Sequence, residues 1–173
     1  MALALGAWVG VKPLTQLAWT GRGLAWGILA TAPLLLGLWW TLRTRWPPAV
    51  RLVRLVEGRI GPLFAGSAPW ELALVATLAG AGEELLFRGV VQTALAGHLP
   101  VWGAVAVTAA LFGLAHFLTP AYAVLAAGVG GYLGWLFAVT GNLLVPAVTH
   151  ALYDLVALAV LAAVKPDPTL SVL

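Results

Sequence analysis

The residues best suited to chemistry in this chain are one glutamate and two histidines on three separate apolar segments. They are Glu83, His116 and His150. A carboxylate and two imidazoles can activate a water molecule by general-base catalysis. With a divalent metal ion such as zinc, the same side chains would form a site with one Glu and two His ligands. The sequence therefore predicts water activation at these residues and leaves open whether a metal takes part.

The spacing of the polar residues predicts which of them face one another. Glu84 and Arg88 are four residues apart with the Glu first, an order that favours an ion pair on one helix face. Glu83 points about 100° away around the same helix, which leaves it free to face a cavity. His150 and Asp154 share a helix face, where the carboxylate can fix the tautomer of the imidazole. Glu84 and Arg88 also have a purely structural interpretation, in which they form a buried ion pair that holds helices together and takes no part in chemistry.

Other hydrolytic chemistries lack the residues that they need. The chain has no cysteine, and its two serines, Ser67 and Ser171, lie in predicted loops outside any GxSG context. Asp154 is the one aspartate within an apolar segment, so an intramembrane aspartyl dyad has no second member. No HExxH motif is present for a zinc site on a single helix. These absences leave the glutamate and the two histidines as the candidate catalytic group.

The composition predicts that these residues lie within a membrane. Of 173 residues, 62% are hydrophobic and 9% are charged, and the mean hydropathy is +0.99. Soluble domains carry about a quarter charged residues, and disordered chains are poor in apolar ones, so both classes are excluded. At about 20 residues per crossing, we expect an all-α, polytopic bundle with five to six membrane segments.

Turn signals divide the chain into the helices that must position the site. Gly130 and Gly134 form a GxxxG spacing that permits close helix packing. Ser67 is the expected N-cap of one segment, with Pro69 in its first turn. An amphipathic helix on the membrane surface is expected at 49–60. The expected membrane segments are residues 23–41, 68–96, 100–118, 121–140 and 143–163.

The basic residues predict the orientation of the bundle. Five of the nine lie between residues 43 and 59, which the positive-inside rule places on the cytoplasmic side. The net charge of +3 then reflects topology, and we expect membrane lipids and no nucleic acid as partners. Within a single domain we expect an N-terminal membrane part with this Arg-rich region, a catalytic helix bundle and a C-terminal tail, at residues 1–66, 67–164 and 165–173.

The polar residues inside the apolar segments must be satisfied there. A charge near the bilayer centre costs at least about 2.5–3.5 kcal/mol, so these groups must pair or share a water-filled cavity. Counted from a turn at Gly97, Glu83 and His116 lie at similar depths, roughly 21 and 25 Å along antiparallel helices. His150 agrees within one or two turns. We therefore expect the three side chains to meet.

Three short motifs carry a resemblance to a known family. Residues 83–88 (EELLFR) fit EExxxR, residues 112–116 (FGLAH) fit FxxxH, and residues 150–154 (HALYD) fit HxxxN/D. In this order, each within an apolar segment, they resemble the CPBP intramembrane proteases. This group contains CaaX proteases and bacteriocin-processing enzymes and is related to the Rce1-type prenyl endopeptidase. The resemblance covers residues 68–158.

The resemblance implies roles for individual residues. Glu83 would polarise the attacking water, while His116 and His150 would assist it or stabilise the oxyanion. Asp154 would orient the site, in a position where many relatives have Asn. The supporting residues would be Glu84, Arg88 and Phe112, with Arg88 holding Glu84 and Phe112 packing rather than reacting. With a metal bound, the ligands would be Glu83, His116 and His150.

The resemblance also implies an activity and a location. We expect an endopeptidase of a prokaryotic cell membrane that cleaves peptides or prenylated, membrane-anchored proteins near the cytoplasmic face. The alternative is a non-enzymatic membrane protein, either a bacteriocin-immunity factor or a proton-coupled carrier, that uses the same polar cluster for binding. The absence of broken-helix inverted repeats counts against a carrier.

Overall fold

The computed structural model describes residues 1–163, and this part of the chain is helical without a strand. The expected tail at 165–173 lies outside the described residues. The elements are α1 (Ala2–Trp8), the short 3₁₀ helix η1 (Pro13–Gln16), α2 (Gly21–Arg43), α3 (Pro47–Arg59), α4 (Gly61–Phe64), α5 (Pro69–Glu84), the π-helical segment η2 (Leu85–Gln92), α6 (Thr93–Ala96), α7 (Val101–Ala115), α8 (Pro120–Thr140) and α9 (Leu144–Ala163). The predicted all-α membrane bundle is confirmed.

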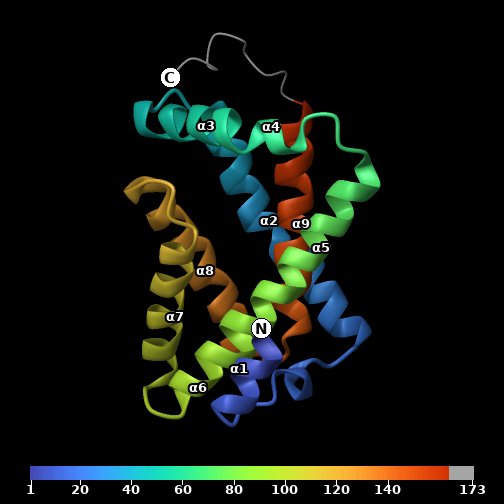
Figure 1. Cartoon of the computed structure of the whole chain (residues 1–173), viewed down its shortest axis with the longest axis vertical. Helices are drawn as coiled ribbons and strands as arrows, with labels where there is room; N and C mark the ends of the chain where they lie inside the picture. The colour runs from blue at the N-terminus through green and yellow to red at the C-terminus, as the bar shows by residue number, and fades with distance from the viewer. Residues whose placement is uncertain (164–173) are drawn as a thin grey trace.

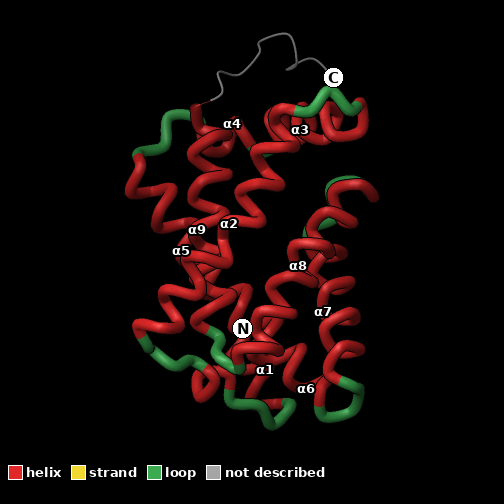
Figure 2. The backbone as a smooth tube through the Cα atoms, turned by 180° about the vertical axis from the view of Figure 1, so that it is seen from behind, coloured by secondary structure: helices red, strands yellow, loops and turns green. Residues whose placement is uncertain are grey.

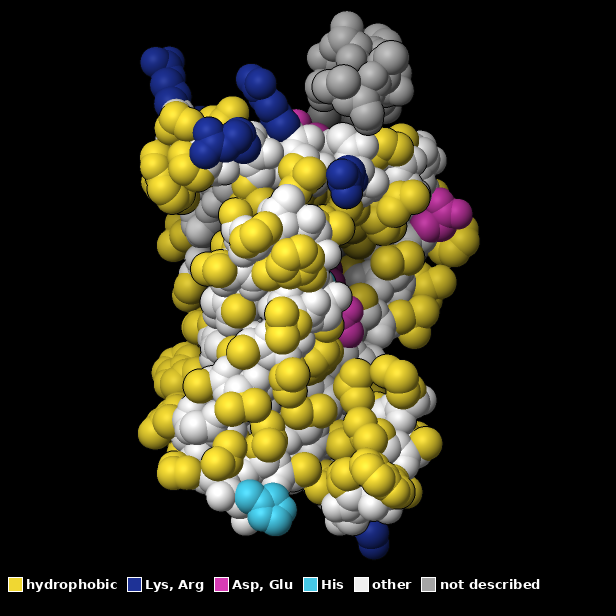
Figure 3. Space-filling view, turned by 60° about the vertical axis from the view of Figure 1, so that its left-hand side comes forward, with side chains coloured by type: hydrophobic (Ala, Val, Ile, Leu, Met, Phe, Trp, Pro, Cys, Tyr) yellow, Lys and Arg dark blue, Asp and Glu magenta, His cyan; other side chains and the backbone are white. Residues whose placement is uncertain are grey.

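Within residues 1–163, three helices, α2, α8 and α9, are long and apolar enough to cross a membrane, and α7 is a shorter apolar helix. Many Leu, Val and Trp side chains on these helices are exposed rather than packed inside the protein. Figure 3 shows hydrophobic side chains over the length of one face of the molecule, with Lys and Arg side chains gathered mainly at one end. An apolar lateral surface with charges at the end is what a lipid environment requires.

The helices form two packed groups that are joined at one end of the molecule. The α7–α8 hairpin lies on one side, and α5 and α2 pack against α9 on the other (Figures 1 and 2). The amphipathic helix expected at 49–60 is α3, which lies across the end of the bundle together with α4. The candidate residues are thus carried by α5 and η2, by the end of α7 and by α9.

Close backbone approach brings the helices into register. A methyl group at Gly80 of α5 would lie 2.8 Å from the backbone nitrogen of Ala151 on α9. In the predicted GxxxG spacing on α8, a methyl at Gly134 would lie 2.8 Å from Gln92 Oε1, and one at Gly130 would lie 3.1 Å from the Phe112 ring. These glycines therefore let the helices that carry the polar residues come together without side-chain collisions.

Two local expectations need correction. The N-cap of α5 is Ala68 rather than Ser67, because the backbone N–H of Ser67 is held in the preceding turn by the Phe64 carbonyl. The Glu71 carboxylate accepts a hydrogen bond from the Ala68 N–H at 2.7 Å, which satisfies the helix start. The regular helix expected at 68–96 is instead α5, η2 and α6, with a π-helical middle.

Candidate active site

A fully buried polar network forms the inner part of the site. Arg88 Nη1 donates a hydrogen bond of 2.7 Å to Glu84 Oε1, and both side chains have 0% exposure. His150 Nδ1 lies 2.9 Å from the same carboxylate oxygen. The second Arg88 nitrogen, Nη2, donates to the Gly130 carbonyl on α8. The predicted pairing of Glu84 with Arg88 is confirmed, and the network additionally joins η2 to α8 and α5 to α9.

The π-helical segment η2 begins directly after Glu84 and contains Arg88 and Gln92. The Gln92 side chain donates a hydrogen bond of 3.0 Å to the Gly134 carbonyl, one turn along α8 from the carbonyl that Arg88 contacts. Two polar side chains of η2 thus match two carbonyls of α8. Single π-helical turns are frequent at functional sites, where the wider turn changes the direction of the side chains.

Phe112 of α7 packs at the centre of the polar residues. It is 3% exposed, and its ring stacks on His116 with 4.3 Å between the centroids. The Arg88 guanidinium lies over the same ring at 4.8 Å from its centroid, and His150 meets its edge at 5.9 Å. A cation over an aromatic face is favourable when it is desolvated. Phe112 therefore holds the two imidazoles and the arginine at fixed mutual positions.

The outer part of the site is formed by Glu83 and His116. Glu83 Oε2 lies 3.5 Å from His116 Nε2, and the two side chains are 32% and 29% exposed. The same Glu83 oxygen has no hydrogen-bond partner among residues 1–163. His116 Nδ1 donates a hydrogen bond of 2.9 Å to the Phe112 carbonyl, which leaves Nε2 as the acceptor of the neutral ring. The expected meeting of Glu83 and His116 is confirmed.

His150 connects the inner and outer parts. Its Nδ1 contacts Glu84, and its Nε2 lies 3.4 Å from Asp154 Oδ2, one turn further along α9. Asp154 is 25% exposed at the side chain, whereas His150 is 6% exposed. The predicted common face of His150 and Asp154 is confirmed. The contact between His150 and Glu84 was not predicted, because no spacing along the chain relates α9 to α5.

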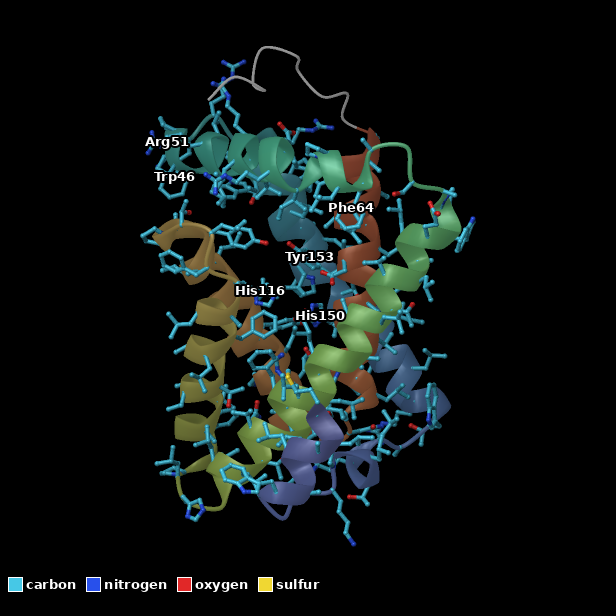
Figure 4. All side chains as sticks on the ribbon, viewed as in Figure 1. Trp46, Arg51, Phe64, His116, His150 and Tyr153 are labelled. Carbon is cyan, nitrogen blue, oxygen red and sulfur yellow. The ribbon has the colours of Figure 1, made fainter. Side chains whose placement is uncertain are left out.

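An open cleft of about 360 Å³ gives access to the outer residues. Side chains of α2, α3, α4, α8 and α9 form its mostly apolar walls, so the first third of the chain contributes to it. In Figure 4, His116, His150 and Tyr153 lie toward the interior below α3 and α4. In Figure 3, acidic side-chain atoms are visible in a recess of an otherwise largely apolar face. The polar lining residues are Thr41, Glu57, Glu83, His116, Tyr122, His150, Tyr153 and Asp154.

Two tyrosines of this lining were missed as site residues by sequence reasoning. Tyr153 lies three residues after His150 on the cleft-facing side of α9, a spacing that could have identified it. Tyr122 lies on α8, and its position in the cleft depends on how the α7–α8 hairpin packs. No pattern in the sequence relates Tyr122 to the three motifs.

The arrangement does not provide a metal site as it stands. Across residues 1–163, no group of three or more His, Cys, Asp or Glu side chains is placed to hold a metal ion. Of the expected ligands Glu83, His116 and His150, the last has both ring nitrogens next to carboxylates, at Glu84 and Asp154. In the described residues, Glu83, His116 and His150 therefore do not converge on one point where an ion would be held.

The comparisons with known proteins agree with the three motifs. The family model described as type II CAAX prenyl endopeptidase Rce1-like matches residues 65–156, which include all three motifs and more than half of the chain. No match was found among the curated proteins or the solved structures. The family is one of proteases, and the helices are those of a membrane protein. The chain therefore belongs to the Rce1-like family of type II CAAX prenyl endopeptidases.

Proposed function

We propose that this protein hydrolyses peptide bonds of prenylated or otherwise membrane-anchored proteins, using water activated by Glu83 and His116 and no covalent intermediate. One observation carries the proposal. Glu83, 32% exposed at the side chain, places Oε2 3.5 Å from Nε2 of His116, the ring nitrogen that does not contact the Phe112 carbonyl, and both residues line a mostly apolar cleft. A carboxylate and an imidazole acceptor that face the same space can hold and deprotonate one water molecule.

In the proposed reaction, a water in the cleft donates one hydrogen bond to Glu83 and the other to Nε2 of His116. Glu83 accepts a proton as the water oxygen bonds to the carbonyl carbon of the substrate. The tetrahedral intermediate then breaks at its C–N bond, and Glu83 returns the proton to the leaving amine nitrogen. The products are a carboxylic acid and an amine, and the enzyme recovers its starting protonation state.

The inner network positions this pair. Arg88 balances the charge of Glu84, and His150 joins Glu84 on α5 to Asp154 on α9. Phe112 stacks on His116 and hydrogen-bonds it through its carbonyl, which fixes both the ring plane and the tautomer. We propose that these residues hold the geometry and do not exchange protons with the substrate.

We propose that the end of the bundle that carries α3 and α4 faces the cytoplasm. Arg51, Arg54 and Arg59 are exposed there, on the helix whose apolar side chains line the cleft. The positive-inside rule places such a cluster on the cytoplasmic side. A membrane-anchored substrate would then enter the cleft from that face, with its apolar part against Leu52 and Val56.

Cleavage of a quenched fluorescent peptide tests the proposal. The purified protein in detergent should cleave a prenylated or lipid-anchored peptide, and Glu83→Gln should lower kcat by about 10²–10⁴-fold because the general base is lost. Glu71→Gln is the matched control. It removes a charge from the same helix, and its amide oxygen can still accept the capping hydrogen bond from Ala68.

The histidine is tested in the same assay. His116→Ala should also lose activity, whereas His98→Ala should not, because His98 is an exposed residue after α6. Full cleavage by Glu83→Gln or by His116→Ala would contradict the assigned mechanism. Binding of the peptide without cleavage by the wild-type protein would favour the non-enzymatic alternative.

A further inference from the structure

The proposed reaction needs a hydrogen-bond donor that the three motifs do not supply. When water adds to a peptide carbonyl, the carbonyl oxygen becomes an oxyanion, which enzymes stabilise with preorganised donors. The carboxylates of Glu57, Glu83 and Asp154 in the cleft act only as acceptors when ionised. Asp154, as a carboxylate, therefore offers no amide donor to the cleft.

The other polar groups of the cleft are already occupied. The Thr41 hydroxyl donates to the Gly37 carbonyl at 2.8 Å. His116 donates its Nδ1 proton to the Phe112 carbonyl and presents an acceptor to the cleft. His150 directs Nδ1 toward the Glu84 carboxylate and Nε2 toward the Asp154 carboxylate. Two neutral hydrogen-bond donors therefore remain for the substrate among the described side chains that line the cleft. They are the phenol groups of Tyr122 and Tyr153.

Both phenol groups are available to a bound substrate. Among the tyrosines of the described chain, Tyr132 is the one whose hydroxyl donates to the protein, at 2.8 Å from the Ala30 carbonyl. Tyr122 and Tyr153 are partly buried side chains that line the cleft, and neither hydroxyl has a hydrogen bond to another group of residues 1–163. Each can therefore donate a hydrogen bond to a substrate oxygen in the cleft.

Position separates the two tyrosines. Tyr122 lines the cleft from α8, together with Glu83 and His116. Tyr153 lines it from α9, next to Asp154 in the chain. Tyr122 is also in the first turn of α8, where the Thr119 side chain accepts its backbone N–H at 3.2 Å. This capped turn directly follows the end of α7, which carries His116.

We infer that Tyr122 is a catalytic residue whose hydroxyl donates a hydrogen bond to the oxyanion formed when the Glu83-activated water adds to the substrate carbonyl. The inference rests on the proposed function and adds a residue outside the three motifs. No bond of Tyr122 breaks in this step, since its proton stays on the phenol oxygen. The hydroxyl on α8 then supplies a donor that the Asp154 carboxylate on α9 cannot supply.

The three tyrosines of the chain form a matched set for the test. Tyr122→Phe removes only the hydroxyl and should lower kcat by about 10²–10³-fold, the effect of losing one oxyanion donor, with KM changed little. Tyr153→Phe should keep kcat within a few-fold of the wild-type value. Tyr132→Phe should keep kcat as well, because its hydroxyl joins α8 to α2 outside the cleft.

A second measurement separates catalysis from a change in shape. A phosphinate peptide, which mimics the oxyanion, should bind Tyr122→Phe more weakly by the same factor as kcat falls, while an ordinary peptide binds equally well. Unchanged kcat in Tyr122→Phe, or an equal loss in Tyr153→Phe, would overturn the inference and leave the proposed function intact. If the wild-type protein cleaves no anchored peptide, the proposed function fails and this inference fails with it.

Discussion

Glu83 and Glu84 are neighbours in the chain and have opposite surroundings. Glu84 is fully buried and contacts Arg88 and His150, whereas Glu83 is 32% exposed and faces His116 in the cleft. A rotation of about 100° around one helix separates the two environments. The comparison shows how surroundings set the role of a glutamate. Where protein groups balance its charge, as at Glu84, the side chain is structural. Where it faces the cleft, as at Glu83, it is available to act on water and substrate.

The largest loss of stability should come from disrupting the buried pair of Glu84 and Arg88. Arg88→Ala leaves the Glu84 carboxylate buried without its balancing charge, and the free energy of unfolding should fall by about 3–5 kcal/mol. Arg88→Lys should recover only part of this loss, because an ammonium group cannot reproduce the planar contacts with Glu84 and the Gly130 carbonyl. Reversible unfolding in mixed micelles measures both variants.

Glu83→Ala serves as the control on the exposed side. The free energy of unfolding of this variant should stay close to that of the wild-type protein. The Oε2 atom of Glu83 has no hydrogen-bond partner among residues 1–163, so no such bond is lost. Similar losses of stability in Glu83→Ala and Arg88→Ala would show that the two glutamates are not separated in the way the geometry indicates.

A smaller loss of stability should follow from moving α5 and α9 apart. The close packing of these two helices brings both parts of the site together. In Gly80→Ala the added methyl would meet the Ala151 backbone at 2.8 Å, so the helices must move apart. Such overpacking costs about 1–3 kcal/mol. Activity should fall as well, because the contact between Glu84 and His150 spans these two helices.

Gly82→Ala, on the same helix, isolates the packing effect. A methyl group at Gly82 meets no atom within 4 Å, so this change should be neutral or slightly stabilising. Equal stability of the two alanine variants, measured by the same unfolding assay, would show that the close approach of α5 to α9 does not position the site.

The smallest effect is expected from metal removal. Since no described group of donors is placed to hold an ion, an excess of EDTA or phenanthroline should leave cleavage of the anchored peptide unchanged. Loss of cleavage that zinc restores would show that Glu83, His116 and His150 rearrange around a metal. The metal content of the purified protein, measured by plasma mass spectrometry, provides the accompanying control.

Most of the helical organisation was predictable because it depends on local signals. The segment expected at 121–140 is α8 (Pro120–Thr140), and the one expected at 143–163 is α9 (Leu144–Ala163). Pro120 and Gly141 mark the bounds of α8, where Pro occupies the first turn and Gly adopts the left-handed conformation with φ of 60°. The π-helical turn of η2 was not predictable, because its side chains pair with carbonyls of a distant helix.

The sequence by itself determined the membrane class, the spans of helices such as α8 and α9, and the pairs that lie one turn apart, such as Glu84 with Arg88 and His150 with Asp154. These follow from composition and from the fixed pitch of an α-helix, which need no knowledge of the rest of the chain. The tertiary structure decided that His150 contacts Glu84 and that Tyr122 reaches the cleft. Those contacts depend on how helices rotate and approach one another, and this is set by packing at points such as Gly80 against Ala151.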